Sequence, residues 1–330
     1  MLPTGDSGEI GHAARLLRAG RLVAFPTETV YGLGANALNP EAVARIYAVK
    51  GRPGTSPLIV HVASIEMAQS FVADWPETAN RLARRFWPGP LTLVLEKRRG
   101  KDEEQRTIPD IVTAGLSTVG LRMPAHPIAL ALIQAAGIPL AAPSANRFTE
   151  LSPTSADHVR NSLGNDIDYI LDGGPCSVGI ESTVLSLAGT QSGSEPMLLR
   201  PGGISRTAVE AIVGPVASAN EVQAGAHPAP GMHPRHYSPR TPLYLISNGK
   251  LPAQGKGIYL QHRYAPSDAH VAIHQMPQTP ADYAAALYEV LHQADAGNYK
   301  WIAVDLPHAT PEWEAIRDRL KRAASSLPTG

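Results

Sequence analysis

Residues 22–34 read Leu22-Val23-Ala24-Phe25-Pro26-Thr27-Glu28-Thr29-Val30-Tyr31-Gly32-Leu33-Gly34, an apolar strand-like segment that runs into a turn rich in hydroxyls and glycines. Asn39 and Pro40 open the next element as an N-cap and first helical residue, and Gly51 closes it. A second apolar segment, residues 58–62, carries a single histidine. Small hydroxyls, cations and a histidine near strand ends predict a site for a small polar molecule beside phosphates.

The composition is that of a globular protein with two domains. The chain has 330 residues, of which 43% are hydrophobic and 18% charged, so a disordered chain is excluded. The 29 basic and 29 acidic residues cancel, so global charge gives no argument for nucleic-acid binding. Cys176 is the single cysteine, which excludes an internal disulfide and predicts a reducing compartment. No apolar run reaches the roughly 20 residues that span a bilayer, and we expect a cytoplasmic protein.

The order of strand and helix signals predicts the domain organisation. Signals alternate through most of residues 1–214, but the strand candidates between 169 and 199 follow one another directly. This order predicts an α/β fold whose twisted, mixed sheet is covered by helices. Residues 215–241 are rich in Ala, Pro, Gly and His without a period, which is typical of a linker. Residues 242–330 alternate again and predict a small Rossmann-like α/β domain without a dinucleotide fingerprint.

Three polar residues near the opening stretch each allow two interpretations. Lys50 and Arg52 lie at the C-terminal end of a predicted helix, where the helix dipole favours cations. They are either surface cations or ligands for phosphate. His61 points to the same strand face as Ile59 and is either a hydrogen-bonded structural residue or part of a site.

Further polar residues interrupt or follow apolar strands. Arg122 interrupts the strand at 119–123, and a buried arginine needs either a ligand carboxylate or an internal salt bridge. Ser144 and Asn146 follow an apolar strand, where they could bind phosphate oxygens or form an ordinary turn. Ser182 and Arg200 lie near glycines at strand ends, and Arg200 precedes a predicted helix N-terminus that favours anions.

The sequence lacks the motifs of several common enzyme classes. It contains no phosphate-binding Gly-x4-Gly-Lys loop, no His-Glu-x-x-His zinc motif and no Gly-x-Ser-x-Gly elbow. A covalent nucleophile is therefore not predicted. The cations and small hydroxyls instead favour positioning and electrostatic catalysis of phosphoryl or adenylyl transfer.

Many short segments, in order along nearly the whole chain, resemble the YrdC-like family in its longer two-domain form. The segments are 26–34, 50–53, 56–58, His61, 88–92, 119–124, 142–146, 181–184, 199–205 and 230–239. The resemblance implies a sheet and helices around a concave cavity. It also implies a nucleotidyltransferase that makes L-threonylcarbamoyladenylate from L-threonine, bicarbonate and ATP, with release of pyrophosphate. The product would serve the N6-threonylcarbamoyladenosine modification of tRNA beside the anticodon.

The resemblance further implies a role for each matching residue. L-threonine would be held by Thr29, His61, Arg122, Ala142 through its backbone, and Ser182. ATP would be held by Arg52, Ser56, Thr118, Ser144, Ser152, Arg200 and Tyr237, of which Tyr237 comes from a linker that closes over the cavity. Lys50, Arg52, Ser144 and Asn146 would form the catalytic signature near the phosphates. Position 56 is serine where the family more often has asparagine, so the shorter side chain reaches less far toward ATP.

The same resemblance implies the cofactor and the partners. Magnesium would enter with ATP, held largely by phosphates and water, and no residue of the chain is expected to form a metal site. Downstream tRNA threonylcarbamoyl transferase proteins would consume the product; direct contact with tRNA is left open and is not required, and no membrane is involved.

Two alternatives stay open. One is a related carbamoyl-adenylating enzyme like those of hydrogenase maturation, although the cysteine-rich modules of that class are missing here. The other is an RNA-binding module, against which the zero net charge and the 5% aromatic content argue.

Overall fold

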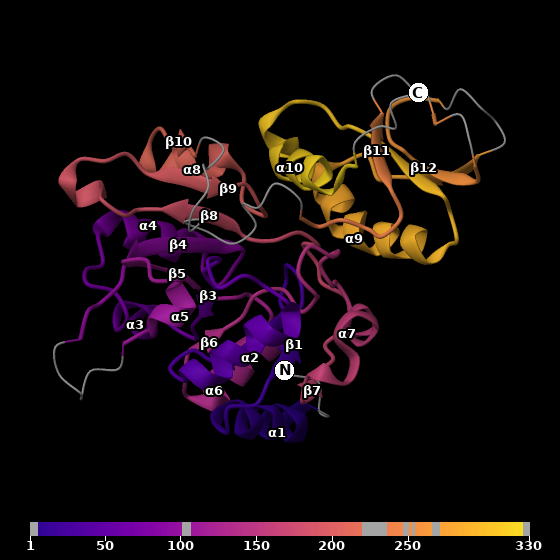
Figure 1. The fold of residues 1–330 in the computed structure, drawn as a ribbon. Coiled ribbons are helices and arrows are strands. Elements are labelled where there is room, and N and C mark those ends of the chain that lie inside the picture. Colours follow the sequence, from indigo (N-terminus) through magenta and orange to yellow (C-terminus); the bar gives the residue numbers. More distant parts are fainter. Residues whose placement is uncertain are drawn as a thin grey trace.

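One mixed sheet organises the first part of the chain (Figure 1). The computed structural model describes residues 6–100, 107–219, 236–246, 251–252, 255–265 and 271–325. Within them, ten strands follow the order β10 (Ala217–Ser218), β9 (Met197–Arg200), β8 (Thr183–Ser186), β4 (Leu91–Glu96), β5 (Thr118–Arg122), β3 (Ile59–His61), β6 (Leu140–Ala141), β2 (Gly32–Asn36), β1 (Val23–Phe25) and β7 (Tyr169–Ile170). Parallel and antiparallel pairs alternate irregularly, which confirms the predicted mixed sheet.

Helix ends follow the capping signals of the sequence. In α2 (Pro40–Lys50), the Asn39 side chain accepts hydrogen bonds from two backbone amides, and Gly51 ends the helix with φ 62°. α6 (Pro127–Ala136) ends at Gly137 in the same left-handed conformation. α8 (Arg206–Val213) begins at Ser205, whose side chain accepts from the Ala208 amide. α2 confirms the helix predicted from Asn39, Pro40 and Gly51.

Other helices complete the cover of the sheet. They are α1 (Asp6–Arg18), α3 (Ile65–Gln69), α4 (Glu77–Phe86), α5 (Asp110–Thr113) and α7 (Ala156–Leu163), with short 3-10 turns η1 (Gly164–Asp166) and η2 (Thr190–Ser192). α1 and α6 pack together with Phe25 of β1 in one apolar cluster. α2, α4 and α8 contribute to a second cluster with Leu33 and Leu93 of the sheet. Because helices cover the sheet, β1 and β3 are buried along their whole length, and β4 is buried up to its last residue.

The C-terminal part forms a smaller parallel sheet. Its strands are β11 (Leu243–Ile246), β14 (Trp301–Asp305), β12 (Gly257–Gln261) and β13 (Ala272–Gln275), in this order, and each neighbouring pair is parallel. α9 (Pro280–Ala296), the turn η3 (Pro311–Trp313) and α10 (Glu314–Ala323) accompany them. This arrangement confirms the predicted Rossmann-like domain.

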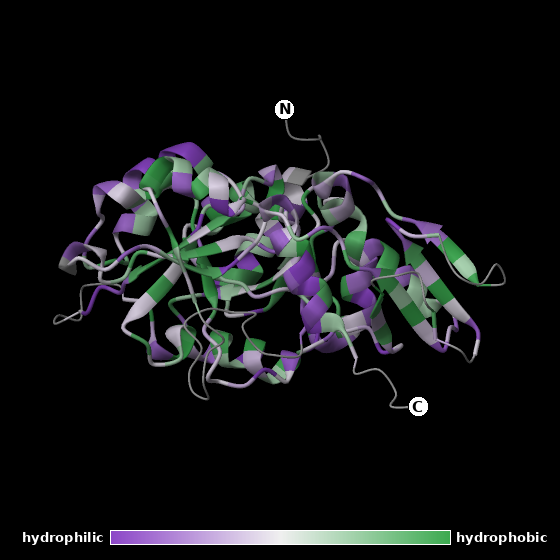
Figure 2. Ribbon diagram, turned by 90° about the horizontal axis from the view of Figure 1, so that it is seen from above, coloured by the Kyte–Doolittle hydropathy of each residue, from purple (hydrophilic) through white to green (hydrophobic). Residues whose placement is uncertain are grey.

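The two parts share one apolar core. Val30, Leu151 and Ile180 of the first part cluster with Tyr283 and Leu287 of α9. Figure 2 shows hydrophobic strands inside both parts and hydrophilic residues along the outer helices. None of the described helices is long and apolar enough to cross a membrane. The strand β10 and residues 236–241 fall within the segment expected to be the linker, whereas its residues 220–235 lie outside the described ones.

Candidate active site

A cavity opens where the turn after β1 meets the ends of several strands. Its volume is about 50 Å³. The lining residues are Thr27, Thr29, Val30, Gly32, Arg52, Ile59, His61, Arg122, Ala142, Pro143, Ser144, Glu181, Ser182, Arg200, His236 and Tyr237. Arg122 and Arg200 are the last residues of β5 and β9, and Ser182 directly precedes β8. The sheet thus aims side chains that are far apart in the sequence at one space.

All five residues expected to hold L-threonine line this cavity. Thr29 is fully buried, and its hydroxyl lies 2.8 Å from that of Thr27. The Ser182 hydroxyl lies 2.8 Å from that of Thr92, which fixes its orientation. Ala142 donates its amide to the carbonyl oxygen of Ile59 at 2.9 Å, which holds its backbone in place at the cavity wall.

His61 is the neutral member of this set. It pairs with Arg122 across β3 and β5, and its Nδ1 is buried with no hydrogen-bond partner among the described residues. Burial, reinforced by the Arg122 charge, lowers the pKa of His61 to about 3. The ring is therefore uncharged at neutral pH and can accept or donate one hydrogen bond to a ligand.

Arg122 forms an internal salt bridge and also lines the cavity, so both interpretations of this residue hold. One guanidinium nitrogen lies 2.7 Å from the Glu28 carboxylate, and Nε donates to the Gly89 carbonyl oxygen at 3.3 Å. The internal salt bridge therefore exists, yet Arg122 also lines the cavity. Glu28 holds the guanidinium in place while also accepting from the Ala125 amide at 3.0 Å. Sequence reasoning missed Glu28, although it lies inside the opening stretch.

Four of the residues expected to hold ATP line the same cavity: Arg52, Ser144, Arg200 and Tyr237. Arg52 donates to the carbonyl oxygens of Ser56 and Pro57 at 3.4 and 3.2 Å, which fixes its side chain. Burial lowers the pKa of Arg52 to about 10, so it stays charged at neutral pH. Arg200 donates to the carbonyl oxygen of Ser182 at 2.9 Å and to its hydroxyl at 3.1 Å.

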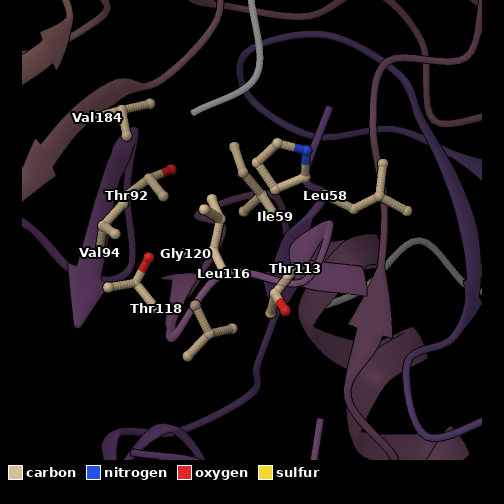
Figure 3. A pocket seen from close by; sticks show the side chains of 11 residues that line it. Leu58, Ile59, Thr92, Val94, Thr113, Leu116, Thr118, Gly120 and Val184 are labelled. Carbon is tan, nitrogen blue, oxygen red and sulfur yellow. The ribbon is translucent and has the colours of Figure 1, made fainter. Parts of the chain in front are cut away.

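Thr118 lies in a neighbouring pocket, shown in Figure 3. This pocket is small, with a volume of about 10 Å³, and shares Ile59 with the first cavity. Leu58, Val94 and Val184 are among its apolar walls, and Thr92, Thr113 and Thr118 add hydroxyl groups. Ser56 lines neither pocket: its carbonyl oxygen receives the Tyr47 hydroxyl at 3.0 Å.

Three further candidates lie behind the cavity wall. The Lys50 ammonium donates to the carbonyl oxygen of Ser144 at 2.6 Å and to that of Asn146. Asn146 donates to the Glu150 carbonyl oxygen at 2.8 Å, and Ser152 donates to Glu181 at 2.6 Å. These side chains brace the residues that line the cavity, because buried carbonyl and carboxylate oxygens already take up their hydrogen bonds.

Two residues that were not among the expected ligands also line the cavity: the carboxylate of Glu181 and the imidazole of His236. Glu181 directly precedes Ser182, and its adjacency to a predicted ligand was the available signal. His236 neighbours Tyr237 and contacts the ring of Phe148 edge-on at 5.7 Å. Burial, followed by the Arg52 and Lys50 charges, lowers the pKa of His236 well below its ordinary value. Among the described residues, no group of three or more His, Cys, Asp or Glu side chains could hold a metal ion.

Comparisons with known proteins cover the whole chain. A family model described as Telomere recombination, for Sua5, YciO and YrdC proteins, matches residues 15–202. A second model, the threonylcarbamoyl-AMP synthase C-terminal domain, matches residues 204–325. The threonylcarbamoyl-AMP synthase of Bacillus subtilis (strain 168) is 41% identical over 98% of this chain and 94% of that relative. The chain belongs to the two-domain, Sua5-type threonylcarbamoyl-AMP synthase family.

Archaeal members of the threonylcarbamoyl-AMP synthase family agree in sequence and fold. The synthase of Pyrococcus abyssi (strain GE5 / Orsay) is 47% identical over 73% of this chain and 68% of that relative. A crystal structure of P. abyssi Sua5 complexed with L-threonine has a TM-score of 0.86 and 37% identity, covering 96% of this chain and 94% of that one. These comparisons confirm two predictions: the chain has a YrdC-like fold with a second domain, and it is an enzyme.

Proposed function

We propose that this synthase makes L-threonylcarbamoyladenylate from L-threonine, bicarbonate and ATP, for the threonylcarbamoylation of an adenosine in tRNA. One observation carries the proposal. All five residues expected to hold threonine face the same cavity as Arg52, Ser144, Arg200 and Tyr237, the expected ATP ligands. A carboxylate-binding arginine beside two further arginines suits an amino acid placed next to a polyphosphate.

The reaction needs two anions held close together. The threonine amine adds to carbon dioxide derived from bicarbonate and forms a carbamate. A carbamate oxygen then attacks the α-phosphorus of ATP, and the bond to pyrophosphate breaks. Arg122 and Ser182 would fix the amino acid, and Arg52 and Arg200 would stabilise charge on the phosphates. Thr118, which lies in the adjoining pocket, would contact ATP from that side.

Magnesium fits this site as a companion of ATP. Glu181 is the carboxylate that lines the cavity, and it is already paired with Arg319 at 2.7 Å. The residues present would therefore leave the ion to phosphate oxygens and water, which is the ligand set Mg²⁺ commonly keeps. When bound, it supplies charge neutralisation for the leaving pyrophosphate.

The proposed reaction implies a separate role for each of three parts of the chain. Residues 1–214 would form the catalytic domain, 215–241 a linker and lid, and 242–330 a supporting domain. Tyr237 belongs to the 215–241 segment and lines the cavity, which supports the proposal of a lid. Its backbone is held in the left-handed conformation, with φ 60°. Its hydroxyl is buried without a partner among the described residues and would donate to a phosphate. The product would pass to downstream tRNA threonylcarbamoyl transferase proteins in the cytoplasm.

Pyrophosphate release from ATP tests the proposal. We expect release only when L-threonine, bicarbonate and Mg²⁺ are all present, together with a nucleotide product heavier than AMP by the threonylcarbamoyl group. Omission of threonine or bicarbonate is the matched control. Release that ignores threonine, or that responds to carbamoyl phosphate instead, would favour the related carbamoyl-adenylating enzymes. Tight RNA binding without any release would favour the RNA-binding alternative.

A further inference from the structure

The second domain places a cation against the wall of the cavity. Arg319 of α10 is 1% exposed, and its Nε lies 2.7 Å from the carboxylate of Glu181, which lines the cavity. Tyr288 of α9 donates to the same carboxylate at 3.1 to 3.2 Å, and Ser152 donates at 2.6 Å. A carboxylate of the first domain is thus held by two side chains of the second.

Arg319 also contacts the residue that reaches the cavity from the linker. Its guanidinium carbon lies 5.1 Å from the centre of the Tyr237 ring, within the range of a cation–π interaction. Tyr237 and Tyr288 lie with their ring centres 6.0 Å apart. Arg319 therefore touches both Glu181 and Tyr237, although it does not itself line the cavity.

The charge of Glu181 explains why this contact matters. Glu181 faces the space in which Arg52 and Arg200 would meet the phosphates. Although burial raises the pKa of Glu181, the charges of Arg319 and Arg200 bring it below its ordinary value, so the carboxylate stays ionised. Without Arg319, this ionised carboxylate would compete with the phosphates for Arg200 and would repel a polyphosphate more strongly in a poorly solvated site.

We propose that Arg319 is a positioning residue for ATP, which neutralises Glu181 and supports the ring of Tyr237 so that the second domain completes the nucleotide half of the active site. This inference rests on the proposed function. It gives the C-terminal domain a direct electrostatic role, because a cation supplied across the domain interface sets the charge of the cavity wall. Threonine, on the Thr29 and Arg122 side, is not expected to depend on it.

The test compares ATP and threonine kinetics in charge variants. Arg319→Met is expected to raise the KM for ATP by roughly tenfold or more, because one partner of a buried ion pair is removed. The KM for threonine should change by less than about threefold, since the contacts of Arg319 are with Glu181, Asp318 and Tyr237, none of which is expected to hold threonine. The double variant Arg319→Met with Glu181→Gln removes both charges and should regain most of the ATP affinity. Arg317→Met, on the same helix but bonded to the Pro307 carbonyl oxygen, is the matched control.

The outcomes separate this inference from the proposed function. Equal losses for ATP and threonine, or no recovery in the double variant, would overturn the positioning role while wild-type release stays threonine-dependent. Wild-type release that ignores threonine would instead defeat the proposed function. Should Arg319→Met not fold, Arg319→Lys keeps the charge beside Glu181 but loses the planar guanidinium, and it should raise the KM for ATP by less than about threefold. A rise of about tenfold in Arg319→Lys would overturn the electrostatic role.

Discussion

At the scale of single residues, burial changes what His61 can do. Its ring is 3% exposed, lies edge-on to Phe25 at 6.1 Å between ring centres, and has Arg122 as its neighbour on the next strand. A protonated His61 would face the Arg122 charge in a poorly solvated place. A neutral ring avoids this cost and keeps its hydrogen-bonding capacity for a ligand.

His61 should make the protein acid-sensitive. Its pKa is about 3 in the folded chain and ordinarily 6.5, so between these values the unfolded chain binds the extra proton. The free energy of unfolding should therefore fall as the pH falls through this window. The loss attributable to His61 between pH 7 and pH 5 is about 2 kcal/mol.

Denaturant unfolding at pH 7 and pH 5 measures this effect. The variant His61→Asn should lose about 2 kcal/mol less than the wild type over the same interval. The exposed His308→Asn is the matched control and should lose as much as the wild type. An unchanged acid sensitivity in His61→Asn would mean that the folded histidine takes up its proton normally.

At the scale of elements, the end of α2 is tied to the turn after β6. The Lys50 ammonium binds the carbonyl oxygens of Ser144 and Asn146, and the Lys50 carbonyl oxygen accepts from the Phe148 amide at 2.7 Å. Helix and turn thus hold each other. This arrangement places the Ser144 hydroxyl at the cavity while the lysine itself stays behind the wall.

Lys50→Met should loosen this connection. The change leaves two buried carbonyl oxygens without a donor, so we expect the free energy of unfolding to fall by about 2 kcal/mol or more. Because Ser144 would shift, the KM for ATP should rise with it. Chemical denaturation and steady-state kinetics measure both effects. Arg45→Met on the same helix removes a half-exposed ion pair to Asp168 and should cost less than about 1 kcal/mol. Equal costs in the two variants would contradict the bracing role.

At the scale of the whole molecule, one glycine lets the two domains meet. Gly179 has φ +76°, and a Cβ there would lie 2.5 Å from the Ala284 carbonyl oxygen and from the Ala285 Cα of α9. No side chain fits between these backbones. The shared core of Val30, Ile180 and Leu287 closes beside this contact.

Gly179→Ala should separate the domains without unfolding the first. We expect α9 to move off its contact, turnover to fall by roughly tenfold or more as Glu181 and Tyr237 lose their support, and thermal unfolding to split into two transitions. Calorimetry and the pyrophosphate assay measure these outcomes. Gly137→Ala has a similar φ of +65° but open space around it, so it adds only the backbone strain. Full activity in Gly179→Ala would show that the interface tolerates the displacement.

Much of the fold was predictable from local patterns, because caps and apolar periods act within a few residues. Asn39 and Gly51 set the two ends of α2 as expected. The short strands β6 and β7 lie within segments expected to be strands, residues 140–142 and 169–171. β2, which begins inside the stretch read as a glycine-rich turn, has only a weak apolar pattern and depends on pairing with β1 and β6. Thr29, His61 and Arg122, which the family resemblance implied as threonine ligands, line one cavity of the sheet, whereas the strand pattern alone left His61 and Arg122 with two interpretations each.

The sequence by itself determined which chemical groups this protein brings to a reaction and the order of its domains. Only the tertiary structure decided which charges meet. Arg122 finds Glu28 across 94 residues, and Arg319 finds Glu181 across 138 residues and a domain boundary. Such pairs form only once packing has buried both side chains, because a charge removed from water then needs its partner nearby. No local pattern carries that information, since the partner is chosen by the packing of the sheet and of the second domain.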